Sequence, residues 1–194
     1  MTSQNLVLNK PNSLFEMNTT LDEHLNLLDQ NLEALLKYLK EFPDKQLNEK
    51  PAPDAWSALQ ICHHLLIAEK LSLQYIKKKF SFNPKLQPVT MATKMRTRLL
   101  KTYLNTPMKF KAPENVSTEN LPATSELGDV KNEWLNYRTE LRSFLKSLPE
   151  DIFNKEVYKH PFAGKLSLQG MLVFFEEHFN RHQKQIKKTL RRVA

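Results

Sequence analysis

Six leucines near the start of the chain recur at three- and four-residue steps and form an apolar stripe. The stripe lies within residues 18–42 and consists of Leu21, Leu25, Leu28, Leu32, Leu35 and Leu39. Because an α-helix completes a turn about every 3.6 residues, this spacing places all of these leucines on one helix face. Thr19 or Thr20 is a suitable N-cap and Pro43 follows the last turn, so residues 18–42 are predicted to be one amphipathic helix.

Three more segments show the same helical pattern. Residues 57–80 begin with Ser57 and Gln60 in the spacing of a capping box, and residues 126–148 and 167–192 follow after proline-containing connections. Four long amphipathic helices predict an all-α protein, a four-helix bundle formed by one domain over residues 1–194. The sequence has only 3 glycines, which argues against a turn-rich β protein.

The connections between these helices are unequal in length. Residues 81–125 form a long, irregular middle connection that contains a short extra helix over 90–105. Residues 106–125 are expected to form a loop packed on one end of the bundle. Residues 46–55 are predicted to be a plain connection, and residues 150–165 to be irregular or briefly extended.

Composition and charge indicate the cellular compartment and limit the kinds of binding partner. Cys62 is the single cysteine, so no intrachain disulfide can form, and a cytoplasmic location is expected. No signal peptide is evident, and the most apolar window carries too many charged and polar residues to span a membrane. The net charge of +8 is concentrated at helix ends, around 77–79 and 184–192. Solvated helix ends explain this better than nucleic-acid binding, because no aromatic residue accompanies the second cluster.

Two histidines in the last predicted helix suggest a metal site. His178 and His182 are four residues apart, on the apolar stripe that also carries Met171, Phe174, Phe175 and Ile186. Zinc-type sites need three or four ligands, so another must come from elsewhere. His64 shares an inward face with Ile61, Ala68, Leu71 and Tyr75 and can supply it. The alternative is that these histidines are ordinary core or surface residues.

The remaining histidines have weaker patterns. His63 is expected at the edge of its helix. The spacing of His24 and His160 from the other histidines does not indicate that either belongs to a site. Cys62 is expected to be a buried small hydrophobe rather than a nucleophile. The sequence contains no glycine-rich phosphate loop and no nucleophile elbow.

Three side chains are candidates for a supporting role next to a metal. Glu69 follows His64 by five residues and could orient a ligand, although a solvated position is the stronger expectation. Glu177 and its neighbour Glu176 flank the histidine pair, and either could orient an imidazole through its second nitrogen or simply lie on the surface. Tyr75 could bring its hydroxyl to a cavity, but it could equally be a core residue with one wet end.

The two histidine-bearing segments resemble a known family. The stretch from Trp56 and Ser57 to His64 and Leu65 is similar to the "W-S-x-x-Q-hydrophobic-x-x-H-L" start of a helix in the DinB/YfiT-like superfamily. The stretch from His178 to Ile186 is similar to that family's "H-x-x-R-H-x-x-Q-I". The resemblance implies an up-down-down-up four-helix bundle, usually dimeric, with a divalent metal, zinc or nickel, held by His64, His178 and His182.

The resemblance leaves two classes of function open. One is a metal-dependent enzyme, a thiol S-transferase or a hydrolase, in which the metal activates a thiol or water for a small-molecule substrate. The other is a non-catalytic stress-response or binding module with a structural or vacant histidine site. A homodimer is expected in either case, and neither nucleic acid nor a membrane is expected as a partner.

Overall fold

The computed structural model describes residues 13–107 and 121–193. Helices make up most of it, and the strands form one short antiparallel hairpin. In chain order the elements are α1 (Ser13–Leu39), α2 (Asp44–Leu47), α3 (Ala58–Ser81), α4 (Met91–Leu104), α5 (Leu127–Lys146), a 3₁₀ helix (Glu150–Asn154), β1 (Tyr158–His160), β2 (Gly164–Leu166) and α6 (Leu168–Leu190). No described helix is both long and apolar enough to cross a bilayer.

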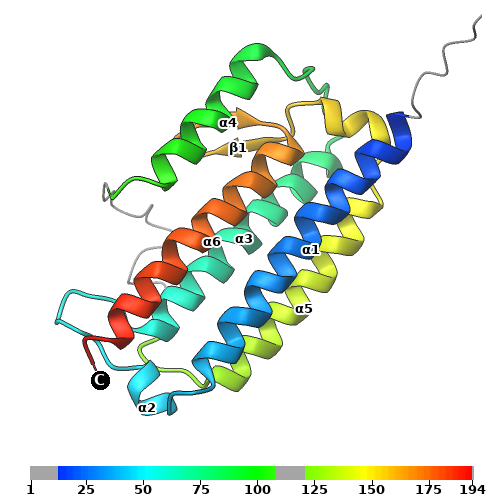
Figure 1. The fold of residues 1–194 in the computed structure, drawn as a ribbon. Coiled ribbons are helices and arrows are strands. Elements are labelled where there is room, and N and C mark those ends of the chain that lie inside the picture. Colours follow the sequence, from blue (N-terminus) through cyan, green and yellow to red (C-terminus); the bar gives the residue numbers. More distant parts are fainter. Residues whose placement is uncertain (1–12, 108–120, 194) are drawn as a thin grey trace, which may run out of the picture.

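The four long helices α1, α3, α5 and α6 lie side by side as a bundle (Figure 1). Following the colours along the chain, α1 and α6 run one way, and α3 and α5 run the other. The all-α bundle with up-down-down-up order is therefore confirmed. This order makes α3 and α6 antiparallel neighbours, which brings two helices that are distant in sequence into contact along their length.

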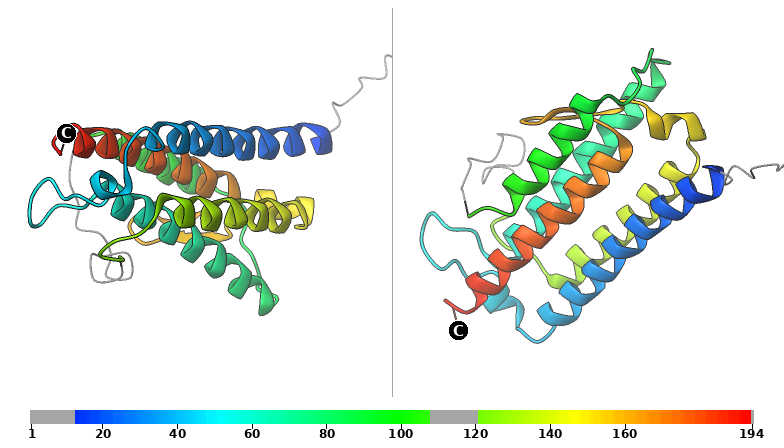
Figure 2. Two further views of the ribbon diagram at one scale, coloured as in Figure 1. Left: turned by 90° about the horizontal axis from the view of Figure 1, so that it is seen from below. Right: turned by 45° about the horizontal axis from the view of Figure 1, so that its top comes forward.

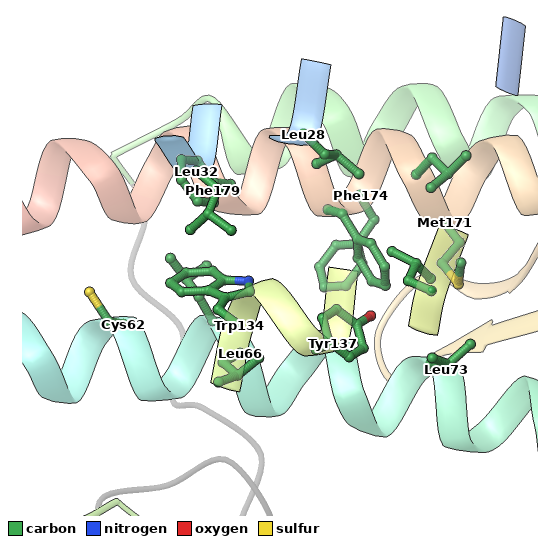
Figure 3. Close-up of a cluster of buried hydrophobic side chains, with 14 of the residues drawn as sticks. Leu28, Leu32, Cys62, Leu66, Leu73, Trp134, Tyr137, Met171, Phe174 and Phe179 are labelled. Atoms are coloured by element: carbon green, nitrogen blue, oxygen red, sulfur yellow. The ribbon is translucent and has the colours of Figure 1, made fainter. Parts of the chain in front are cut away.

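The core of the bundle is built from the predicted stripes. The predicted leucines of α1 are all buried, and so are Val130, Trp134, Tyr137, Leu141 and Leu145 of α5. Figure 3 shows Trp134 lying between Phe179 of α6 and Leu66 of α3. Trp134 and Phe179 are fully buried, and their ring centroids are 5.8 Å apart. This packing holds α3, α5 and α6 together at mid-length, where each fully buried side chain contributes about 1.5–3 kcal/mol.

Local capping fixes where the site-bearing helices begin. The Ser57 hydroxyl accepts from the amide of Gln60, while the Gln60 side chain accepts from the amide of Ser57, both at 3.2 Å. The predicted capping box is therefore confirmed. Ser167 caps α6 by accepting from the amide of Gly170 at 3.0 Å. The register of both helices is thus set within a few residues of their first turn.

The connections differ from the sequence predictions in detail. The predicted connection at 46–55 begins inside a short helix, α2, which follows Pro43 and ends at Leu47. Residues 150–165 form the 3₁₀ helix and most of the hairpin, with Gly164 at a positive φ of 77°. The short extra helix is confirmed as α4. Most of the loop predicted at 106–125 lies outside the described residues.

Helix α4 lies outside the four long helices, next to α6 and the hairpin (Figure 2). Gly170 permits this close approach, because a Cβ on it would lie 2.8 Å from Oγ1 of Thr97. Thr93 of α4 donates a hydrogen bond to Glu156, which precedes β1. Within the described residues, the middle connection therefore packs a further helix against α6 and the hairpin.

A buried ion pair crosses the bundle between α3 and α5. Glu69 accepts from Nη2 of Arg138 at 2.9 Å and from Nε1 of Trp134 at 3.3 Å. Its side chain is 2% exposed, so the expectation that Glu69 is solvated is wrong. Burial raises the pKa of the Glu69 carboxyl, while the charge of Arg138 opposes that rise. The sequence around Glu69 could not show this burial, because the cation that makes it possible, Arg138, lies on another helix.

Candidate metal centre

The rings of His64, His178 and His182 converge between α3 and α6. Their nearest nitrogens all lie within 4.8 Å of one another. Nε2 of His64 is 3.3 Å from Nε2 of His178, and the ring centroids are separated by 4.5–5.2 Å. Two imidazoles bound tetrahedrally to zinc at about 2.0–2.1 Å have nitrogens about 3.3 Å apart. The spacing therefore fits a divalent ion shared by these rings.

The proton position on His182 also fits metal binding. Nδ1 of His182 lies 2.8 Å from Oε1 of Gln185, an oxygen that can only accept. Nδ1 of His182 therefore carries the proton, and Nε2 keeps its lone pair. Ligating histidines are commonly held through the second nitrogen in this way. Gln185 is a supporting residue that the candidates of the sequence analysis did not include, although the Gln of the "H-x-x-Q-I" pattern marked its position.

Burial keeps the rings of His178 and His182 uncharged. It is the main cause that lowers the pKa of His182 to about 3, and the neighbouring His64 lowers it further. The pKa of His178 lies well below its ordinary value, because of burial first and then the charges of His182 and His64. Neutral imidazole is the form that binds metals, so the environment favours the ligating state at neutral pH.

The cluster opens onto a cavity of about 980 Å³ between α3, α4, α6 and β1. All three candidate ligands line it. Trp56 lies beside His64 with ring centroids 4.9 Å apart, and Phe174 stacks on His178 at 5.1 Å. The cavity size falls within the range of small-molecule sites, and its wall combines aromatic surface with a few polar groups. A substrate could therefore reach an ion held by the cluster.

The three predicted supporting side chains take different positions. The carboxylate of Glu69 bonds Arg138 and Trp134 as described above. Glu177 accepts from Asn105 and forms an ion pair with Lys101, both near the end of α4. These contacts direct both carboxylates to partners other than the imidazole cluster. Tyr75 lines the cavity and is 38% exposed.

The other titratable candidates are also placed. His63 is half-buried at the helix edge, with Nε2 3.0 Å from the Ser125 hydroxyl. His24 pairs with Glu176 across α1 and α6, so this carboxylate orients an imidazole outside the cluster. Cys62 is fully buried, and burial raises the pKa of its thiol to about 12, which agrees with a packing role.

His160 is the position that sequence reasoning missed. It is 5% exposed on β1, it lines the cavity, and its ring centroid lies 4.5 Å from that of Phe174. Burial lowers the pKa of His160 to about 4. Its neighbours in sequence carry no helical periodicity, so no local pattern pointed it toward the cluster. The hairpin, which is a tertiary feature, brings it there.

Comparison with known proteins identifies a family and a similar fold. Residues 27–186 match the model of the DinB superfamily. The chain is 24% identical over 157 residues to the uncharacterized protein YuaE of Bacillus subtilis (strain 168), covering 80% of this chain and 90% of YuaE. Its fold is similar to that of YfiT from Bacillus subtilis, with a TM-score of 0.58 and 14% identity over 98% of this chain and 93% of YfiT. YfiT is described as a probable metal-dependent hydrolase with an unusual four-helix bundle topology.

Proposed function

Since the chain belongs to the DinB superfamily, we propose that it is a metal-dependent enzyme whose divalent ion is held by His64, His178 and His182. The observation that carries this proposal is the convergence of these rings on the wall of a large cavity. An ion that only braced the bundle would need no such access, whereas an enzyme needs room for a substrate beside the ion. The cavity therefore favours a catalytic site over a structural one.

The donor set limits the chemistry. Three neutral imidazoles suit zinc or nickel and leave room for a further small ligand. An ion bound there would act as a Lewis acid and lower the pKa of a coordinated water or thiol toward neutrality. The proposed reaction is accordingly hydrolysis of a small-molecule substrate or transfer of a group to a thiol. The description of the fold relative YfiT supports the hydrolase class.

The chain's own residues have distinct tasks in this proposal. Gln185 holds His182 with its Nε2 lone pair available to the ion. Trp56 and Phe174 pack against ligand rings and exclude water from one side of the cluster. Fixed ligands surrounded by apolar surface make the electrostatic effect of a bound ion stronger than it would be in water.

Metal analysis of protein prepared without a histidine tag tests the binding site. We expect a stoichiometric divalent ion in the wild type and its loss after His64→Ala, His178→Ala or His182→Ala. The matched control is His63→Ala, which removes a neighbouring imidazole and should leave the metal content unchanged. Each variant should still fold, because the core of the bundle does not depend on the ion. Unchanged metal in His64→Ala would contradict the assignment.

A cobalt(II)-loaded sample separates the two reaction classes. Binding of a thiol to cobalt produces an intense sulfur-to-metal charge-transfer band, which water does not produce. We expect a small alkanethiol to produce this band if the enzyme uses a thiol. Hydrolysis of activated esters or amides that depends on the metal, with no thiol band, would assign the hydrolase class. Bound metal with neither behaviour would support the non-catalytic module instead.

A further inference from the structure

The ring of His160 is held in one tautomer by the hairpin turn. Its Nδ1 accepts hydrogen bonds from the backbone amides of Phe162 at 3.2 Å and Ala163 at 3.1 Å. Both partners are donors, so Nδ1 must present a lone pair. In a neutral imidazole the proton then belongs to Nε2, and His160 is a hydrogen-bond donor through that atom.

This donor is available to a ligand in the cavity. No hydrogen bond reaches Nε2 of His160 from the described residues, although its Nδ1 is satisfied twice. His160 lines the cavity, and Nε2 is the ring nitrogen that its turn does not use.

The ring of Phe174 contacts both His160 and His178, and so connects the donor to the histidine cluster. His160 contacts Phe174 edge to face at 4.5 Å between centroids, and Phe174 stacks on His178 at 5.1 Å. Tyr158, on the same face of β1, is bonded to the Ser72 hydroxyl at 2.9 Å. Ser72 donates to the carbonyl of Ala68, so the Tyr158 hydroxyl donates to Ser72 and its proton is already used. On the buried face of β1, Nε2–H of His160 is thus the donor that is left for a ligand.

The charges around the cavity favour an anion. Among the described lining residues, the cations are Lys159, Arg181, Lys184, Lys188 and Arg192, whereas the acids are represented by Asp54 alone. Clefts lined by one sign of charge concentrate ligands of the opposite sign. A carboxylate oxygen matches both this potential and the unused N–H of His160.

We propose that His160 donates a hydrogen bond from Nε2 to a carboxylate of the substrate, whose reacting end lies at the cluster of His64, His178 and His182. The substrate class is therefore a small carboxylate with its reactive group a few bonds away. This inference rests on the proposed function, because it places the reacting end at the metal centre. It adds the substrate's charge and the residue that recognises it.

Two substitutions separate recognition from a merely structural role in the turn. In His160→Asn the amide oxygen can replace Nδ1 as acceptor for the turn, but nothing replaces Nε2–H. In His160→Gln the amide nitrogen can replace Nε2–H, but the turn loses its acceptor. A structural role predicts that His160→Gln is the more damaging change, whereas a recognition role predicts that His160→Asn is.

Binding of probe thiols to the zinc-loaded protein tests the proposal by calorimetry. The probes are mercaptoacetate, 3-mercaptopropionate and 4-mercaptobutyrate, each compared with the alkanethiol of equal length. We expect His160→Asn to weaken at least one carboxylate probe about tenfold, the effect of losing a hydrogen bond to a charged acceptor. The matched alkanethiol should change less than twofold, and His160→Gln should recover part of the affinity.

The outcomes distinguish this inference from the proposed function. Equal losses for carboxylate and alkanethiol, or no loss with any probe, would overturn the role of His160 while leaving the metal centre intact. A wild-type protein that takes up no zinc would overturn both. Nitrogen-15 spectra of the histidine rings add a direct check, because a proton on Nδ1 of His160 at neutral pH would also overturn the inference.

Discussion

The side-chain oxygen of Gln185 lies 2.8 Å from Nδ1 of His182, within one turn of α6. This bond determines which nitrogen of His182 faces the cluster. We predict that Gln185→Leu lowers metal affinity about 10- to 100-fold, the usual effect of losing the partner of a ligating histidine. Competition with a chromogenic chelator measures the change. Gln183→Leu on the same helix is the control, and an equal loss there would refute the role of Gln185.

Stability of the metal-free protein should fall as the pH drops below about 6.5. The folded-state pKa is about 4 for His160 and about 3 for His182, both lowered by burial, against about 6.5 when unfolded. Between these values the unfolded chain binds more protons, so acid favours unfolding. Each histidine should contribute a loss of about 2 kcal/mol between pH 7 and pH 5.

Urea unfolding at these two pH values measures this loss. The variant His160→Asn removes one of the titrating groups and should lose about 2 kcal/mol less than the wild type on acidification. A wild-type free energy of unfolding that stays constant from pH 7 to pH 5 would contradict the burial of these rings in the uncharged form.

The pair of Glu69 and Arg138 should behave as a coupled unit. Arg138→Met leaves a buried carboxylate without its cation, so we expect a loss of about 3–5 kcal/mol in the free energy of unfolding. The double variant Glu69→Leu/Arg138→Met should recover most of it, since two apolar side chains need no partner. The exposed pair of Lys70 and Glu133 is the control, and Lys70→Ala should cost about 1 kcal/mol or less. Additive single and double variants would argue against the coupling.

The contact between α4 and α6 depends on Gly170. Replacing glycine by alanine in a helix interior normally raises the free energy of unfolding by about 0.5–1 kcal/mol. At Gly170, however, the new Cβ would lie 2.8 Å from Oγ1 of Thr97. We therefore predict that Gly170→Ala lowers the melting temperature, and that Thr97→Ala in the same chain relieves much of the loss. Gly128, whose added Cβ meets no atom within 4 Å, is the control. A stabilising Gly170→Ala would show that α4 lies further from α6.

A homodimer remains a prediction, and α4 offers a surface for it. Met91, Met95 and Leu99 are 73%, 51% and 62% exposed and lie four residues apart on one helix face. We expect light scattering at micromolar concentration to give twice the chain mass, and Met95→Glu to reduce it to one chain. Leu135→Glu, on α5, is the control. A wild-type monomer would refute the dimer, and a dimer insensitive to Met95→Glu would place its interface elsewhere.

The elements of the bundle were predictable because their signals are local. Ser57 and Gln60 cap α3 within its first turn, and the leucine spacing of α1 defines a buried face without reference to other helices. The inward direction of His64, His178 and His182 follows from the same periodicity. The short helix α2 and the hairpin carry no such repeat, which is why the sequence described them only as connections.

Local signals in the chain therefore define the helices, their buried faces and the histidines that those faces carry. The tertiary structure decided which groups meet: Glu69 with Arg138 across 69 positions, and His160 with Phe174 beside the cluster. The physical reason is the range of the interactions. Helix periodicity and capping act within a few residues, whereas a buried charge finds its partner, and a strand residue its cavity, only when distant segments pack together.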